Sequence, residues 1–221
     1  MTAEKILFID IETVSEFETV EQLDERWYAL WKKKAETLFG DIPVDLAYSK
    51  AALVPEFGKI VCISVGYLKA GKWSSKSFFS DNEKNLLEDF KELLNKFPTY
   101  KLAGHYAKGF DFPYICKRML KHHIEIPASL DIKGKKPWEI TLIDTKEMWQ
   151  FGDWKNSTSL DLLTAFFGIE SPKDAMDGSM VHDVYYKDQN LTKISLYCEK
   201  DVLACAQVYC AMSNLPIPTI L

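Results

Sequence analysis

The sequence lacks several features that would assign it quickly to a class of protein. Its five cysteines include no C-x-x-C pair, which argues against a zinc site. Basic residues are outnumbered, with 27 Lys and Arg against 32 Asp and Glu and a net charge of −5. A protein that coats nucleic acid through a bulk positive field is therefore excluded. A nucleic-acid partner would need local basic patches or metal ions to offset the phosphates.

Long apolar segments are missing as well. No apolar run reaches about 18 residues, the length of a membrane-spanning helix, and no signal peptide precedes the first strand. We therefore expect a cytoplasmic protein with no membrane partner. The cysteines lie mostly within apolar stretches, which is typical of buried thiols in a reducing compartment rather than of disulfides or zinc ligands. With 221 residues, the chain suits one domain, or one domain with an insertion.

Hydrophobic periodicity predicts an α/β domain with a mixed sheet. Strands are expected at 5–11, 60–68, 73–79, 100–105 and 137–144, and the second and third of these look like a hairpin. Helical spacing covers 16–39, 82–97, 112–123, 157–168 and 190–212. Ser80 or Asp81 is expected to cap the helix at 82–97. The order β-β-β-α-β-α-β-α-α favours helices packed on a mixed sheet.

Two acids at the end of the first strand raise the question of function. Asp10 and Glu12 are two residues apart, so both side chains point to one face of an extended strand. Acid-x-acid pairs are common in this composition, because chance alone gives about five of them. Two acids at the solvent end of a strand are therefore an ordinary explanation, unless further acids end neighbouring elements.

Further acids are found at two such places. Asp111 follows a strand and a turn where a helix is expected to begin, and a helix N-cap is the ordinary role for an aspartate there. Tyr197 and Asp201 are four residues apart, so they share one face of the last helix. The polar stripe of an amphipathic helix would explain that pair. Each segment, taken alone, has an explanation without function.

Taken in order, the three segments resemble the motifs of a known superfamily. "FIDIET" (8–13), "GHYAKGFDFPYI" (104–115) and "YCEKDVLAC" (197–205) are similar to the three exonuclease motifs of the DEDD 3′→5′ exonucleases. The Tyr-x-x-x-Asp form of the third motif is that of the tyrosine branch, DEDDy. "PEFGKIVCISVG" (55–66) and "DGSMV" (177–181) resemble the stand-alone predicted exonucleases related to the proofreading domains of B-family DNA polymerases.

The resemblance implies a fold and a division of the chain. The fold would be ribonuclease H-like, an α/β fold with a mixed five-stranded sheet flanked by helices. A single 3′→5′ exonuclease domain would span 1–221, with a helical insertion at about 16–50. The substrate would be the 3′ end of a single-stranded nucleic acid, DNA rather than RNA, cut by hydrolysis of phosphodiester bonds. Nothing in the sequence indicates a protein partner.

The resemblance also assigns roles to residues. Two Mg²⁺ or Mn²⁺ ions would be held by four carboxylates, with Asp10 bridging both ions and Asp111 holding the second. Glu12 and Asp201 would complete the site that binds the attacking water. Tyr197 would orient that water, since a phenol with a pKa of about 10 is a poor free base. The opening pair of acids would then be metal ligands, because bound cations offset the repulsion between crowded carboxylates.

One position departs from the family pattern. An asparagine is common in the second motif where this chain has Tyr106, and that asparagine is thought to help place the substrate end. The departure concerns substrate binding and leaves the metal ligands intact. His105 beside it is expected to be a structural histidine with satisfied ring nitrogens.

Contacts to the substrate stay open at this stage. The basic groups Lys133, Lys135 and Lys136, and Lys117, Arg118 and Lys121, could touch phosphates, although solvated surface charge is the ordinary explanation. Trp27, Tyr28 and Trp31 could stack on bases, but their spacing also fits core packing. The stretch 148–154 is ambiguous in the same way.

Two alternative functions also stay open. An exoribonuclease would use the same acids, and nothing in the sequence recognises a 2′-hydroxyl. A non-catalytic nucleic-acid-binding module belongs to a different class of protein. The intact set of five catalytic-type residues argues against such a module, because binding alone has no need of them.

Overall fold

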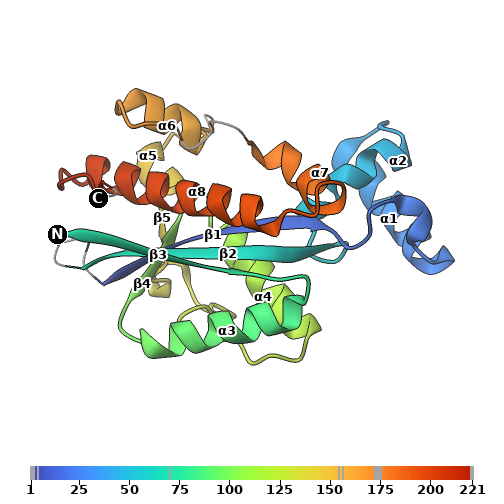
Figure 1. Ribbon diagram of the computed structural model, residues 1–221, viewed down its shortest axis with the longest axis horizontal. Helices are drawn as coiled ribbons and strands as arrows, with labels where there is room; N and C mark the ends of the chain where they lie inside the picture. Colours follow the sequence, from blue (N-terminus) through green and yellow to red (C-terminus); the bar gives the residue numbers. More distant parts are fainter. Residues whose placement is uncertain are drawn as a thin grey trace.

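A five-stranded sheet in the order β3-β2-β1-β4-β5 forms the centre of the molecule (Figure 1). The computed structural model describes residue 3 and residues 5–69, 71–153, 155, 157–171 and 176–219. The strands are β1 (Ile6–Ser15), β2 (Gly58–Lys69), β3 (Lys72–Phe79), β4 (Lys101–Gly104) and β5 (Ile143–Asp144). β1, β2 and β3 pair antiparallel, whereas β4 is parallel to β1 and to β5. The predicted mixed five-stranded sheet and the β2–β3 hairpin are therefore confirmed.

Helices cover both faces of this sheet. The long helix α8 (Leu191–Met212) lies on one face, and α3 (Glu83–Lys96) and α4 (Asp111–Lys121) lie on the other (Figure 1). The short helices α5 (Thr145–Gln150), α6 (Leu160–Phe166) and α7 (Val181–Tyr186) are on the α8 side, whereas α1 (Glu25–Phe39) and α2 (Val44–Ala47) lie beyond one end of the sheet. Single 3₁₀ segments occur at Val20–Gln22, Tyr48–Leu53, Pro137–Glu139 and Gly178–Met180. None of the helices in the described ranges is long and apolar enough to cross a membrane.

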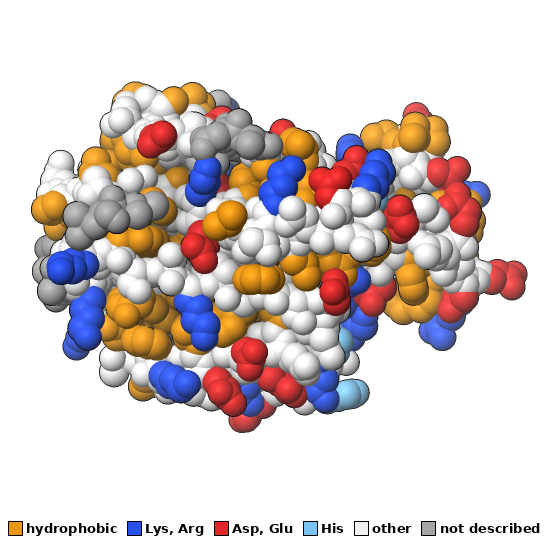
Figure 2. All heavy atoms as spheres, in the orientation of Figure 1, with side chains coloured by type: hydrophobic (Ala, Val, Ile, Leu, Met, Phe, Trp, Pro, Cys, Tyr) orange, Lys and Arg blue, Asp and Glu red, His pale blue; other side chains and the backbone are white. Residues whose placement is uncertain are grey.

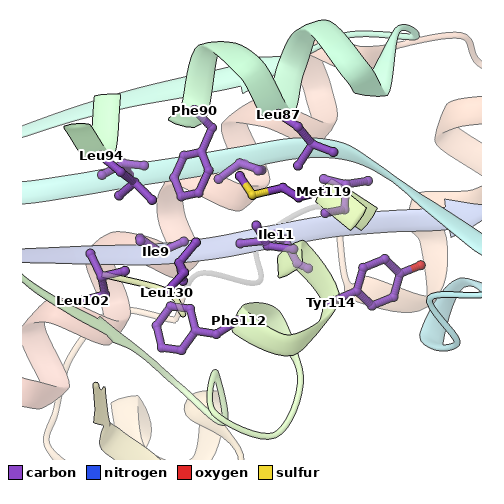
Figure 3. Close-up of a cluster of buried hydrophobic side chains, with 14 of the residues drawn as sticks. Ile9, Ile11, Leu87, Phe90, Leu94, Leu102, Phe112, Tyr114, Met119 and Leu130 are labelled. Atoms are coloured by element: carbon purple, nitrogen blue, oxygen red, sulfur yellow. The ribbon is translucent and has the colours of Figure 1, made fainter. Parts of the chain in front are cut away.

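β1 is apolar on both faces because helices cover both of them. Ile9 and Ile11 face α3 and α4, where they join a core that includes Phe90 and Phe112 (Figure 3). Phe8 points to the opposite face and packs in a second core beneath α8. This two-sided burial explains why the strand begins as a continuous hydrophobic run, and it fixes β1 as the central element of the fold.

β1 and β4 separate where β4 ends. β1 pairs with β4 only over Ile6–Phe8, and in the described structure no strand continues that pairing further along β1. β4 stops at Gly104, where an added Cβ would lie 2.9 Å from the Ile9 carbonyl oxygen, so this close approach requires glycine. On the other side, the pairing with β2 shifts between Glu12 and Thr13, an irregularity of the kind found beside active sites. β1 therefore continues past its acids to Ser15, and the expected strand end at residue 11 is wrong.

Other boundaries also differ from the expectations. Only part of 16–39 is α-helical: α1 begins after Asp24, whose Oδ1 accepts a hydrogen bond from Trp27 N at 2.8 Å. α3 is capped by Asn82, which accepts from Asn85 N at 3.1 Å, and not by Ser80 or Asp81. The strand expected at 137–144 is reduced to β5, since the only strand that pairs with it in the described ranges is the four-residue β4.

A buried ion network joins α4, α3 and β2. Arg118 is 1% exposed, and its Nη2 lies 2.5 Å from Glu83 Oε2 while its Nε lies 2.8 Å from Glu83 Oε1. Glu83 also accepts a hydrogen bond from Ile60 N at 2.7 Å, and the carbonyl oxygen of Pro55 accepts from Arg118 Nη1 at 2.9 Å. The interpretation of Arg118 as surface charge or as a phosphate contact is therefore wrong. This buried residue holds α4 against α3 and β2.

Removing Arg118 should destabilise the protein strongly. The Arg118→Ala variant leaves the Glu83 carboxylate buried without its main partner, which costs about 3–5 kcal/mol of unfolding free energy. Urea unfolding followed by tryptophan fluorescence measures this loss. The matched control is Lys84→Ala, whose pair with Glu88 is exposed and 3.9 Å long; it should change stability by no more than about 1 kcal/mol. Equal losses in the two variants would show that the buried network does not hold α4.

Candidate active site

The five residues expected in a catalytic site gather around the acids of β1. Asp10 and Glu12 come from β1, Asp111 is the first residue of α4, and Tyr197 and Asp201 lie on α8. Each of the acids Asp111 and Asp201 acts electrostatically on both Asp10 and Glu12. Segments almost 200 residues apart in sequence therefore meet where β1 and β4 separate.

Asp111 is placed by the free edge of β1. Its Oδ1 accepts a hydrogen bond from Ile11 N at 3.2 Å, a donor that β4 would use if it continued beside β1. Asp111 lies inside the first turn of α4, and the N-cap position is Phe110, which makes no side-chain cap. The N-cap role considered for Asp111 is therefore wrong. Its carboxylate reaches across to the strand and brings the start of α4 to the acids of β1.

Tyr197 and Asp201 meet through the geometry of α8. Residues four apart lie on one helix face, and the Tyr197 hydroxyl donates a hydrogen bond to the Asp201 carboxylate. Burial raises the pKa of Tyr197 far above its usual range, and the charges of Asp201 and Glu12 raise it further. The phenol therefore keeps its proton and acts as a hydrogen-bond donor.

Cys198 adds a thiol that the sequence interpretation did not place here. Its Sγ lies 3.4 Å from Asp10 Oδ2, and one possible ligand atom from each of Asp10, Glu12 and Cys198 lies within 4.8 Å of the others. Burial raises the pKa of this thiol well above its ordinary value, so it stays protonated. The sequence did contain a signal for Cys198. Residues 197 and 198 lie four and three positions before Asp201, so all three share one face of the helix.

The acids repel one another in a dehydrated site. Burial raises the pKa values of Asp10 and Glu12 well above their ordinary range, and the neighbouring carboxylates raise them further. Burial also raises the pKa of Asp111 to about 7, against the lowering effect of its hydrogen bond from Ile11 N. Converging carboxylate oxygens are the donor set that hard divalent cations prefer. The residues present therefore fit such ions.

Asp144 is a second residue that the sequence interpretation missed. This buried carboxylate caps α5 by accepting from Lys146 N at 3.0 Å. It also accepts hydrogen bonds from Tyr106 N at 2.9 Å and Lys108 N at 3.0 Å, both in the turn before α4. Asp144 thus ties the second-motif turn to the end of β5. The signal was an aspartate at the end of a strand with a helix after it, a pattern also produced by simple capping.

His105 has the structural role expected of it. Its Nδ1 lies 3.0 Å from Thr145 Oγ1 and its Nε2 lies 3.1 Å from the Thr158 carbonyl oxygen. Burial lowers the pKa of His105, so the ring is neutral near pH 7. Both nitrogens are occupied by groups that hold α5 and the segment before α6.

Three of the remaining candidates for substrate contact have partners within the fold. Trp31 is fully buried and packs against Phe57 with ring centroids 5.1 Å apart, as core packing predicts. Trp27 is 43% exposed but also contacts Phe57. Lys121 pairs with Glu16 at 2.9 Å. In the ambiguous stretch 148–154, Trp154 lies outside the described residues. Charges of both signs are interspersed over the face of the molecule seen in Figure 2.

Comparison with known proteins decides the family. Residues 53–216 match the model of a family described as "Predicted 3'-5' exonuclease related to the exonuclease domain of PolB". The chain belongs to this family. It is thus a predicted 3′→5′ exonuclease, as the three motifs indicated, and the family implies a nucleic-acid substrate and divalent metal ions in general. No curated protein matches the chain in sequence.

A solved structure supports the fold of this exonuclease family. The family B DNA polymerase from the hyperthermophilic archaeon Pyrobaculum calidifontis superimposes with a TM-score of 0.56 at 15% sequence identity. The match covers 90% of this chain and 23% of the polymerase chain. The chain therefore corresponds to under a quarter of that protein, and the likeness establishes the ribonuclease H-like fold alone.

Neutralising Asp111 should stabilise the metal-free protein, and only above acidic pH. Its pKa of about 7 in the fold exceeds the unfolded value of about 3.9. The folded state therefore binds more protons in this window, and stability falls as pH rises through it. Asp111→Asn keeps an acceptor for Ile11 N and removes the charge. With EDTA present, it should be more stable than wild type at about pH 8 and equal to it near pH 4.

Urea unfolding at the two pH values measures the difference. Asp89→Asn is the matched control, since Asp89 is exposed on α3, and it should show no pH-dependent gap. A gain for Asp111→Asn of the same size at both pH values would contradict the clustered-charge explanation.

Proposed function

We propose that the protein is a divalent-metal-dependent exonuclease that removes mononucleotides from the 3′ end of single-stranded DNA by a two-metal mechanism. The observation that carries the proposal is the convergence of Asp10, Glu12, Asp111 and Asp201 from three separate elements, with Tyr197 hydrogen-bonded among them. The family relationship to the exonuclease domain of PolB supports DNA as the substrate. As a proposal of the same kind, the whole chain is one exonuclease domain in which the helical segment at about 16–50 is an insertion.

The four carboxylates would hold Mg²⁺ or Mn²⁺ ions. When bound, such ions lower the pKa of a coordinated water and stabilise the charge that develops on the phosphate. The oxygen ligands of this site match the preference of both ions. Glu12 and Asp111 are buried and Asp10 is partly buried, so these side chains keep fixed orientations. Their mutual repulsion in the free protein favours cation binding, because a bound cation offsets the repulsion between neighbouring carboxylates.

Tyr197 would orient the attacking water. Its hydroxyl proton is held toward Asp201, which leaves the phenol oxygen as an acceptor for a water hydrogen. The raised pKa keeps the phenol neutral, so Tyr197 positions the water and takes no proton from it. Positioning of this kind reduces the barrier by holding the nucleophile near its line of attack.

Digestion of labelled oligonucleotides tests the proposal. A 5′-labelled single strand of DNA should shorten progressively from its 3′ end with Mg²⁺ or Mn²⁺, because the acids need cations to accept a phosphate. EDTA should abolish the reaction, and a 3′-phosphate should block it. RNA of the same sequence, digested in parallel, decides between DNA and RNA. Equal cutting of 3′-blocked strands would show that the protein is an endonuclease and not an exonuclease. Binding without any cutting would favour a non-catalytic module.

Variants should separate ligands from the positioning residue. Asp10→Ala should lower kcat by several orders of magnitude and remove the rise in melting temperature that Mn²⁺ gives, since a ligand is lost. Tyr197→Phe should lower kcat by about 10²–10⁴-fold and keep the Mn²⁺ effect on melting. Tyr209→Phe, on the same helix but packed against Phe8 with ring centroids 5.5 Å apart, is the control and should retain wild-type activity. Loss of the Mn²⁺ effect in Tyr197→Phe would contradict this assignment.

A further inference from the structure

The turn before α4 carries an exposed tyrosine in an unusual backbone conformation. Tyr106 has φ of 60°, in the left-handed region that non-glycine residues rarely adopt. Its side chain is 51% exposed. Its carbonyl oxygen accepts from Gly109 N and Phe110 N, each at 3.0 Å, and its own N–H is bound by Asp144. Because Asp111 follows directly, the turn fixes the tyrosine ring relative to the acids.

The ring of Tyr106 supports a lysine. Lys146 Nζ lies 3.8 Å from the ring centroid, a distance at which the cation is attracted to the ring face. The ring also lies against the backbone of Gly109, where an added Cβ would be 2.5 Å from Tyr106 Cε2. Within the described part of the chain, no carboxylate forms an ion pair with Lys146, whereas Lys108 beside it is bound by Glu147 at 2.7 Å. Lys146 therefore keeps its charge available for an anion.

A cavity opens beside this pair. It has a volume of about 360 Å³ and is lined by Tyr106, Lys146, Asp144 and Gln150 among others. The cavity borders the acid cluster through Asp144, whose charge raises the pKa of Asp111.

We propose that Lys146, held over the ring of Tyr106, binds a backbone phosphate of the substrate strand on the 5′ side of the scissile bond. This proposal rests on the proposed function. In a 3′→5′ exonuclease the terminal nucleotide occupies the acids, so the strand that continues beyond them lies on the 5′ side. Each nucleotide carries a phosphate whatever its base, and a lysine contact to it is independent of sequence. The cavity then takes the strand next to the nucleotide being removed.

Removing Lys146 should weaken binding of a strand but not of a mononucleotide. With Ca²⁺ replacing Mg²⁺ to suppress hydrolysis, fluorescence anisotropy gives the Kd of a labelled single-stranded DNA oligonucleotide for Lys146→Ala. One lost phosphate contact should raise Kd about fivefold at 0.1 M salt and reduce the slope of log Kd against log salt by about 0.7. Inhibition by a nucleoside monophosphate, whose only phosphate sits at the acids, should stay unchanged.

Two further variants test the arrangement. Lys96→Ala removes the same charge from an exposed site just before β4, at the opposite end of that strand from Tyr106, and should bind DNA like wild type. Tyr106→Gly fits the left-handed backbone and removes the ring under Lys146. It should weaken DNA binding, and adding Lys146→Ala should then have less effect than in wild type, since the residues act together.

The outcomes separate this proposal from the proposed function. An unchanged Kd and salt slope in Lys146→Ala, with a wild type that binds and digests DNA, would overturn the phosphate site alone. Equal weakening of the mononucleotide would also overturn it, because Lys146 would then act on the terminal nucleotide. A wild type that neither binds nor digests nucleic acid would overturn the proposed function.

Discussion

Asp10, Glu12 and Asp111 are held in one dehydrated region although all three would carry the same charge in water. Such an arrangement persists only if the backbone that bears it cannot relax. β1 cannot move because helices pack on both of its faces, and α4 is fixed by the buried Arg118. The apolar cores and the ion network thus hold the carboxylates close together, as a metal-binding site requires.

Local patterns in the sequence predicted most of the elements but not where they end. The apolar run of β1, the β2–β3 hairpin and α8 follow from periodicity, which depends on neighbouring residues. The course of β1 past Asp10 depends instead on its pairing with β2, which runs to Ser15 opposite Gly58. On the free edge of β1, Ile11 N donates to a residue 100 positions away. β5 is short because its partner β4 ends at Gly104. Contacts of this range leave no mark on the strand's own composition.

The residues of the candidate site also divide into those that local sequence predicts and those that only long-range contacts reveal. Its five residues could be named because their spacing in three motifs resembles a family, whereas Cys198 and Asp144 act through contacts that no motif describes. Arg118 stands between Lys117 and Lys121 in sequence and so resembled part of a basic surface. Helical rotation turns it inward, and only the position of Glu83 on another helix reveals its role.

The left-handed backbone at residue 106 also has an evolutionary consequence. Asparagine tolerates that conformation better than tyrosine does, and the codons for the two amino acids differ by a single base. A lineage could therefore exchange the strained residue for the relaxed one in one mutational step, without passing through an intermediate amino acid. That step would relax the backbone of the turn and at the same time remove the ring that lies under Lys146, so its two effects oppose each other at this position.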